Sequence, residues 1–120
     1  MPKNNDDLPI FVKWMDFTKW LLVATDSFPK KARFTFSDRL VSLALNIVED
    51  LVEARYSKNK KLILRRINMN LEKMRMLIRI SYEIRLISRK NYEHASRDIN
   101  EVGKMLGGWM KQQDQNEKAW

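Results

Sequence analysis

The sequence contains no cysteine, only three glycines and three prolines, and no long apolar run. The absence of cysteine excludes a disulfide framework, a thiolate metal site and a cysteine nucleophile. Scarce glycine and proline, with abundant Leu, Ile, Met, Arg, Lys and Glu, favour helices. No segment reaches the roughly 20 consecutive apolar residues of a membrane span, and the polar, acidic start is unlike a secretory signal. We therefore expect a cytoplasmic protein.

The apolar residues that remain predict four amphipathic helices in one domain. Apolar side chains recur at intervals of three and four over about 10–24, 36–54, 58–87 and 92–109. Short turns between such segments favour antiparallel neighbours. The prediction is an all-α, antiparallel up-and-down four-helix bundle over residues 8–112, with a disordered N-terminal tail at 1–7 and a C-terminal tail at 113–120.

Polar residues at the breaks in the apolar pattern predict where these helices begin and end. Thr35 and Asp38 resemble a capping box, while Ser57 and Ser88 are placed to cap the third and fourth helices. The glycine pair at 107–108 is expected to loosen or end the fourth helix. The third helix is then predicted to be the longest, at about 45 Å for roughly 30 residues.

Positive charge is concentrated between residues 55 and 90. That stretch holds twelve Lys or Arg against two acids, for +10, whereas the rest, with eleven bases and thirteen acids, sums to −2. Lys and Arg on a helix usually form a face that is simply solvated. A helix charged only for solubility, however, carries both acids and bases, whereas the bases of this stretch repel one another. A cationic helix is the usual surface for a phosphate-rich partner, so RNA is the expected ligand, with DNA as the alternative. The predicted nucleic-acid-binding residues are Lys58, Lys61, Arg65, Arg66, Arg75, Arg79, Arg85 and Arg89.

The third predicted helix also carries more apolar surface than a small bundle can bury. One arc, which includes Ile67, Leu71 and Met74, suits the core, and a second arc lies roughly 120° away. The second arc is either a wide core face or a contact with another copy of the chain, and we favour the copy because large apolar patches are seldom left in water. The predicted oligomer-interface residues are Met69, Met76, Leu77, Ile80 and Ile84.

Several segments together resemble the accessory variability determinant (Avd) family of diversity-generating retroelements. The resemblance covers about 8–112 and rests on FPKKARFTFSDRL, LVEARYSKNK, LEKMRMLIRISYEIRLISRKNYEHA and GKMLGGWMK. Helical proteins encoded in intervening sequences of bacterial ribosomal RNA genes share the bundle but fit these strings less well.

The resemblance implies a four-helix bundle that assembles as a basic, ring-like homo-oligomer, a pentamer in that family. It implies a non-enzymatic protein that binds RNA and the retroelement reverse transcriptase and supports error-prone template-repeat cDNA synthesis, called mutagenic retrohoming. Such proteins are encoded by bacteria, archaea or phages. We expect no cofactor, no metal, no small-molecule substrate and no membrane partner.

The single histidine leaves an enzymatic alternative open. Arg89 and His94 have a spacing similar to the motif of the helical HEPN ribonucleases, where such a pair cleaves RNA. The plainer interpretation pairs His94 with Asp98, one helical turn on. Binding of the basic helix to a membrane surface is a further alternative, but membrane-surface helices have a single apolar face, and this helix has two apolar arcs.

Overall fold

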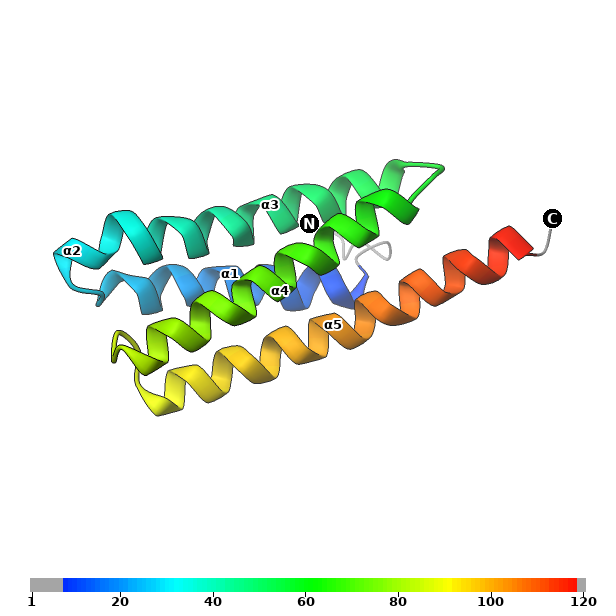
Figure 1. The fold of residues 1–120 in the computed structure, drawn as a ribbon. Helices are drawn as coiled ribbons and strands as arrows, with labels where there is room; N and C mark the ends of the chain where they lie inside the picture. Colours follow the sequence, from blue (N-terminus) through cyan, green and yellow to red (C-terminus); the bar gives the residue numbers. More distant parts are fainter. Residues whose placement is uncertain (1–7, 119–120) are drawn as a thin grey trace, which may run out of the picture.

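Four long helices pack side by side in a computed structural model that describes residues 8–118 (Figure 1). They are α1 (Pro9–Asp26), α3 (Asp38–Tyr56), α4 (Lys61–Glu83) and α5 (Arg89–Lys118). A short helix α2 (Lys30–Ala32) and a π-helical segment η1 (Arg33–Ser37) join α1 to α3. The described residues contain no strand. The predicted all-α, antiparallel up-and-down bundle is thus confirmed, and residues 1–7 lie outside the described part.

The bundle has four sides because each long helix packs against two others. The neighbouring pairs are α1 with α3, α3 with α4, α4 with α5, and α5 with α1. The first apolar arc of α4 is buried as predicted, with Ile67, Leu71 and Met74 fully inaccessible to solvent. The indole Nε1 of the buried Trp14 donates a hydrogen bond to the Ala44 carbonyl, 2.9 Å away, so the largest core side chain leaves no polar atom unsatisfied.

The start of α3 differs from the predicted capping box. Thr35 lies within η1, and its Oγ1 donates to the Ala32 carbonyl at 3.3 Å instead of accepting a bond from a helix N-terminus. The chain is already helical from Lys30, so α3 has no free N-terminal amides at Asp38 to be capped. The capping-box prediction is therefore wrong.

The turn between α3 and α4 also has a different chemistry from the predicted one. Ser57 ends α3 rather than starting α4, and its Oγ donates to the Glu53 carbonyl at 2.8 Å. The ammonium group of Lys60 donates to the carbonyls of Ala54, Arg55 and Ser57 at 2.6, 3.1 and 2.7 Å. A lysine at this place satisfies helix-end carbonyls that have no intrahelical partner.

The turn between α4 and α5 comes earlier than predicted. α4 ends at Glu83 instead of about residue 87, because Arg85 adopts a left-handed conformation with φ of 65°. The Leu86 amide then donates to the Ser81 carbonyl at 2.7 Å, which closes the helix end. The cap predicted at Ser88 is confirmed, since its Oγ accepts a hydrogen bond from the Asn91 amide at 3.1 Å.

The longest helix is α5, with 30 residues, and the prediction that the third helix is longest was wrong. α5 continues through Gly107 and Gly108 and includes residues 113–118, which had been predicted to be part of a tail. A Cβ at either glycine would meet nothing within 4 Å, so neither position is crowded by a neighbouring segment. Within the described residues, no helix is both long and apolar enough to span a bilayer.

Candidate nucleic-acid interface

Most of the predicted binding residues on α4 already contact acidic groups of the same subunit. Arg66 makes a forked contact with Asp50 of α3, with Nε donating to Oδ2 at 3.1 Å and Nη2 to Oδ1 at 2.9 Å. Glu53 adds a third oxygen at 3.3 Å. The hydrogen bonding that Arg66 donates to the Asp50 carboxylate is the main reason that the pKa of Arg66 is raised above its usual value. A phosphate would have to compete with two carboxylates here.

Four more of the predicted residues make ion pairs along α4 and α5. Arg75 pairs with Glu72, and its Nε donates to the Asn100 side chain at 3.2 Å. The other three pairs are Lys61 with Asp114 at 3.6 Å, Arg79 with Glu83 at 3.2 Å and Arg89 with Glu93 at 3.3 Å. Exposed pairs of this kind are weak, about 0–1 kcal/mol, so a phosphate could still displace the acids.

Three predicted residues present their charge to solvent. Lys58, Arg65 and Arg85 are exposed and make no ion pair with any other described residue. Lys58 and Arg65 lie near the turn between α3 and α4, whereas Arg85 lies in the turn between α4 and α5, at the other end of the bundle. The structure therefore does not bring the eight predicted residues together as one free cationic surface.

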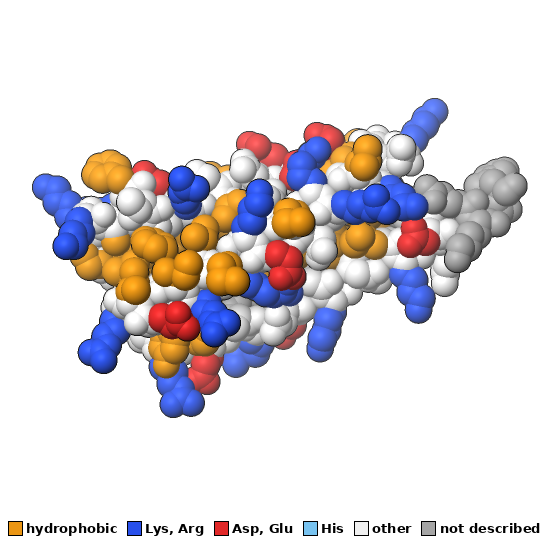
Figure 2. All heavy atoms as spheres, viewed as in Figure 1, with side chains coloured by type: hydrophobic (Ala, Val, Ile, Leu, Met, Phe, Trp, Pro, Cys, Tyr) orange, Lys and Arg blue, Asp and Glu red, His pale blue; other side chains and the backbone are white. Residues whose placement is uncertain are grey.

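A straight row of cations runs instead along α5. Its members are seven residues apart, all exposed, and none makes an ion pair with a described residue: Lys90, Arg97, Lys104 and Lys111. We call these four residues the α5 row. Figure 2 shows Lys and Arg side chains projecting along the edge of the molecule formed by α5.

The α5 row lies opposite the buried stripe of its own helix. The buried residues Ala95, Ile99, Val102 and Leu106 occupy the inner side of α5, and a step of seven keeps the four cations on the outer side. Successive members are about 10.5 Å apart, and the row is about 31 Å long. The nearby acids are already paired, Glu93 with Arg89 at 3.3 Å and Glu101 with Lys13 at 3.0 Å.

The sequence contained a signal for this row that the count of charges missed. The charge-rich stretch was closed at residue 90, which separated Lys90 from Arg97, Lys104 and Lys111. A search for bases at a seven-residue interval would have found all four, because that interval returns to nearly the same side of a helix.

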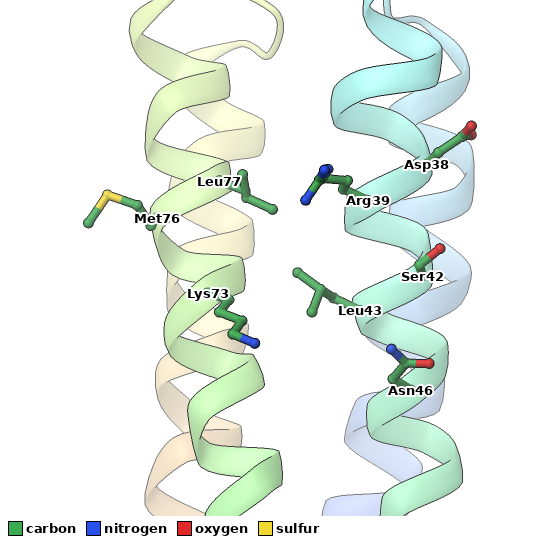
Figure 3. Close-up of a pocket in the computed structure, with 8 residues that line it drawn as sticks. All are labelled: Asp38, Arg39, Ser42, Leu43, Asn46, Lys73, Met76 and Leu77. Carbon is green, nitrogen blue, oxygen red and sulfur yellow. The ribbon is translucent and has the colours of Figure 1, made fainter.

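The second apolar arc of α4 is largely uncovered in the subunit. Met69, Met76 and Ile84 are 57%, 56% and 53% exposed, and Leu77 and Ile80 are half-buried. Leu77 faces Leu43 of α3 across a groove whose lips carry Arg39 and Lys73, while Met76 points out of the groove (Figure 3). Figure 2 shows hydrophobic side chains gathered over this α3–α4 side, toward the end of the bundle where α2 lies.

The structure separates the two residues of the ribonuclease alternative. His94 Nε2 lies 3.1 Å from Asp98 Oδ2, and the imidazole packs on Trp20 with ring centroids 4.3 Å apart. Arg89 is exposed and contacts Glu93. Five residues along an α-helix correspond to a rotation of about 140°, so Arg89 and His94 face different directions. The plainer interpretation of His94, a pair with Asp98, is confirmed. Among the described residues, no group of three or more acidic or histidine side chains could hold a metal ion.

Comparison of the chain with protein families identifies a matching family model. No curated protein matches the chain. The family model described as bAvd-like matches residues 10–113, which include α1 from Ile10 onward, all of α3 and α4, and α5 as far as Gln113. The match contains both the α5 row and the exposed arc of α4. The chain therefore belongs to the bAvd-like family.

Proposed function

We propose that this chain is a non-enzymatic accessory protein of a diversity-generating retroelement that binds RNA and the retroelement reverse transcriptase. In this role it supports error-prone cDNA synthesis from the template repeat. Membership of the bAvd-like family indicates an Avd accessory protein of such elements. The binding of RNA and of the reverse transcriptase is the more specific part of the proposal.

The observation that carries the nucleic-acid role is the α5 row. Four exposed cations with no acidic partner among the described residues lie on one line about 31 Å long, on the outer side of a rigid helix. Phosphates of a nucleic-acid strand can neutralise such a row and release their condensed counterions, which supplies affinity without sequence specificity. Lys58, Arg65 and Arg85 extend the cationic surface at the two ends of the bundle.

The proposed working form is a ring-like homo-oligomer, a pentamer as in the Avd family, with reverse transcriptase and RNA as its partners. The exposed apolar arc of α4 supports self-association, because apolar patches of this size are seldom left in water. Assembly repeats the α5 row once per subunit, so that one RNA can contact several rows. No cofactor takes part in this proposal.

The RNA-binding role is tested by removing the charges of the α5 row. The variant replaces Lys90, Arg97, Lys104 and Lys111 by Gln, and affinity for a single-stranded RNA is measured by fluorescence anisotropy at a series of salt concentrations. For each subunit that binds through its row, the slope of log affinity against log salt should become shallower by about 3 units.

A control variant loses four charges that are already paired. It replaces Arg66, Arg75, Arg79 and Arg89 by Gln and therefore has the same net charge as the α5-row variant. We expect a smaller change of slope, because these four side chains are held by carboxylates in the free protein. Equal slopes for the wild type and the α5-row variant would contradict the proposed RNA surface.

The partner role predicts a reverse transcriptase gene beside the gene for this protein, and it is tested with that reverse transcriptase. The two proteins should co-purify, and the reverse transcriptase should synthesise template-repeat cDNA only when this protein is present. The α5-row variant should reduce the yield of cDNA. Full cDNA synthesis by the reverse transcriptase alone would contradict the accessory role.

A further inference from the structure

The turn that joins α1 to α3 holds an aromatic ring out in solvent. Phe34, in the π-helical segment η1, is 79% exposed. Two residues before it, Ala32 is buried, and two residues after it, Phe36 packs partly buried against the core. Because these two neighbours face inward, Phe34 lies on the outer side of the segment. The ring therefore contributes nothing to the core of the subunit.

No other aromatic or cationic group of the described residues covers this ring. Phe34 makes no contact with another ring and has no guanidinium over it. Tyr56 is 78% exposed at the end of α3, but the guanidinium of Arg55 lies 5.6 Å from its ring centroid. A cation at that distance interacts with the ring face. Phe34 is thus the exposed aromatic side chain with its ring open to a ligand.

The backbone on both sides of Phe34 is held in place by hydrogen bonds. Before it, the Ala32 amide donates to the Pro29 carbonyl at 2.8 Å. After it, the buried Ser37 Oγ donates to the Thr25 carbonyl of α1 at 3.3 Å. A side chain on a fixed backbone loses little conformational entropy when a ligand binds. Single π-helical turns are also frequent at functional sites.

Two lysines stand beside the exposed ring. Lys30 and Lys31 precede Phe34 by four and three residues, so the three side chains share the outer side of the turn. Both lysines are exposed, and neither makes an ion pair with a described residue. The acids of this region, Asp26 and Asp38, line the hollow between α1 and α3 instead. The ring is therefore accompanied by two positive charges that no carboxylate holds.

This end of the bundle also carries the beginning of the α5 row. Figure 1 shows that α2 and the turn between α4 and α5 lie at the same end. Arg85 lies in that turn, and Lys90, the first member of the α5 row, lies in the first turn of α5. Figure 2 shows Lys and Arg side chains projecting from this end. A nucleic-acid strand that follows the α5 row past Lys90 reaches the end of the bundle that carries Phe34.

An open aromatic ring between cations fits an unpaired nucleobase. Every base has a π-face that can stack on an aromatic side chain, while neighbouring cations bind the phosphates. In a duplex the bases are paired and stacked on one another, so only a single-stranded segment can offer one. A membrane surface would need a wider apolar helix face than one ring beside two lysines. A contact with another copy of the chain would need a larger apolar patch.

We propose that Phe34 is a stacking site for an unpaired base of the RNA, and that Lys30 and Lys31 bind phosphates next to that base. The inference rests on the RNA binding of the proposed function. The α5 row supplies affinity that depends on salt and not on strandedness. Phe34 adds a preference for single-stranded over double-stranded RNA.

The stacking role is tested by changing the ring without changing the charge. Phe34→Ala should lower the affinity for a single-stranded RNA, measured by fluorescence anisotropy, by about 5- to 150-fold. Phe34→Leu keeps an apolar side chain but no ring and should lose most of the same affinity, whereas Phe34→Tyr should bind like the wild type. The slope of log affinity against log salt should stay unchanged in all three variants, because no cation is removed.

Two controls separate stacking from a general effect of the substitution. Tyr56→Ala removes an equally exposed ring at the other end of the bundle, and its affinity should fall less than that of Phe34→Ala. A fully paired duplex of the same sequence should bind wild type and Phe34→Ala equally. Circular dichroism of each variant verifies that the helices are intact, as expected for a substitution at an exposed position.

A photochemical cross-link tests the contact itself. A single-stranded RNA that contains 5-iodouridine is bound to the wild-type protein and irradiated, and mass spectrometry of the digested complex identifies the linked residue. The link should be at Phe34 and should disappear in Phe34→Ala. Links confined to other residues would overturn the assignment.

The outcomes separate this inference from the proposed function. If Phe34→Ala kept wild-type affinity while loss of the α5 row still made the salt slope shallower, the stacking site would be overturned and RNA binding would stand. If the wild type bound no RNA, both would be overturned. A smaller mass of Phe34→Ala in light scattering would place the ring in a contact between copies and overturn the stacking site. An equal loss of affinity for the duplex would overturn the preference for unpaired bases.

Discussion

At the scale of single residues, two basic residues have structural roles that a count of charges does not reveal, Lys60 through its side chain and Arg85 through its backbone. The ammonium of Lys60 bonds to three carbonyls at the end of α3, and Arg85 adopts the left-handed conformation that ends α4. Both residues belong to the cationic stretch that first indicated nucleic-acid binding. Charge at a helix end can therefore stabilise the fold as well as attract a ligand.

Replacing Lys60 by Met should lower the free energy of unfolding by about 2 kcal/mol, because three carbonyls lose a charged donor. Lys58→Met is the matched control, since Lys58 is exposed and makes no ion pair with a described residue. Its effect should stay within about 0.5 kcal/mol. Urea denaturation followed by circular dichroism measures the free energy of unfolding of both variants. If Lys60→Met and Lys58→Met lowered it equally, Lys60 would not be acting as a helix cap.

Replacing Arg85 by Gly should raise the free energy of unfolding by up to about 1 kcal/mol, because glycine adopts positive φ without the steric cost of a Cβ. The same change removes one exposed cation, so RNA affinity should fall. Thermal denaturation and anisotropy measure the two effects. A loss of stability would contradict the strain assigned to Arg85.

The burial of side chains could be predicted from sequence far better than their pairing. Ile67, Leu71 and Met74 are buried as their spacing predicted, because a buried stripe leaves a local period in the sequence. The contact of Arg66 with Asp50 joins residues 16 positions apart on different helices, and no local pattern records it. The same limit applies to Lys61, which the charge pattern predicts as a nucleic-acid contact although Asp114 of α5 lies 3.6 Å away.

At the scale of secondary-structure elements, four helices were predictable but several of their ends were not. The capping box at Thr35 failed because η1 keeps the chain helical into α3. The glycines at 107 and 108 did not end α5, since a helix that packs against α1 and α4 tolerates the roughly 1 kcal/mol that each glycine costs. Tertiary packing thus overrode local propensity at both places.

The contact between α4 and α5 includes one glycine whose role can be measured. A Cβ at Gly103 would lie 2.8 Å from Nη2 of Arg75, whereas a Cβ at Gly107 would meet nothing. Gly107→Ala should therefore raise the free energy of unfolding by about 1 kcal/mol through helix propensity alone. Gly103→Ala should give a smaller gain, because Arg75 must move away from Asn100.

The difference between these two variants, measured by thermal denaturation, reports the worth of the Arg75 contacts. We expect the two variants to differ in their free energy of unfolding by less than about 1 kcal/mol, as is typical when exposed charged contacts are lost. A Gly103→Ala protein destabilised by several kcal/mol would mean that Arg75 is held rigidly, and its guanidinium could not turn to a phosphate.

At the scale of the whole molecule, the account assigns separate roles to two surfaces. We propose that the exposed apolar arc of α4 joins copies of the chain and that the outer side of α5 holds RNA. The excess apolar surface of α4 was apparent from sequence, whereas the hollow between α1 and α3, lined by Leu22 and Val41, required the bundle, because residues from α1 and α3 become neighbours only after folding. The bAvd-like family match fits this description of an accessory scaffold.

Replacing Met76 by Asp should dissociate the assembly and leave the subunit folded. Met76 is largely exposed in the subunit, so a carboxylate there costs little until another copy must bury it. Light scattering should give a smaller mass for Met76→Asp than for the wild type. Met105→Asp makes the same chemical change on α5, away from the exposed arc of α4, and should keep the wild-type mass.

The most direct test of the account is the salt dependence of RNA affinity for the wild type and for Met76→Asp. One α5 row can contribute a slope of about −3 against log salt for single-stranded RNA. An assembly that presents several rows to one RNA should show a slope at least twice as steep, and dissociation by Met76→Asp should reduce it to about the single-row value. The same slope for both proteins would contradict the claim that assembly is what gathers the cationic rows onto one nucleic acid.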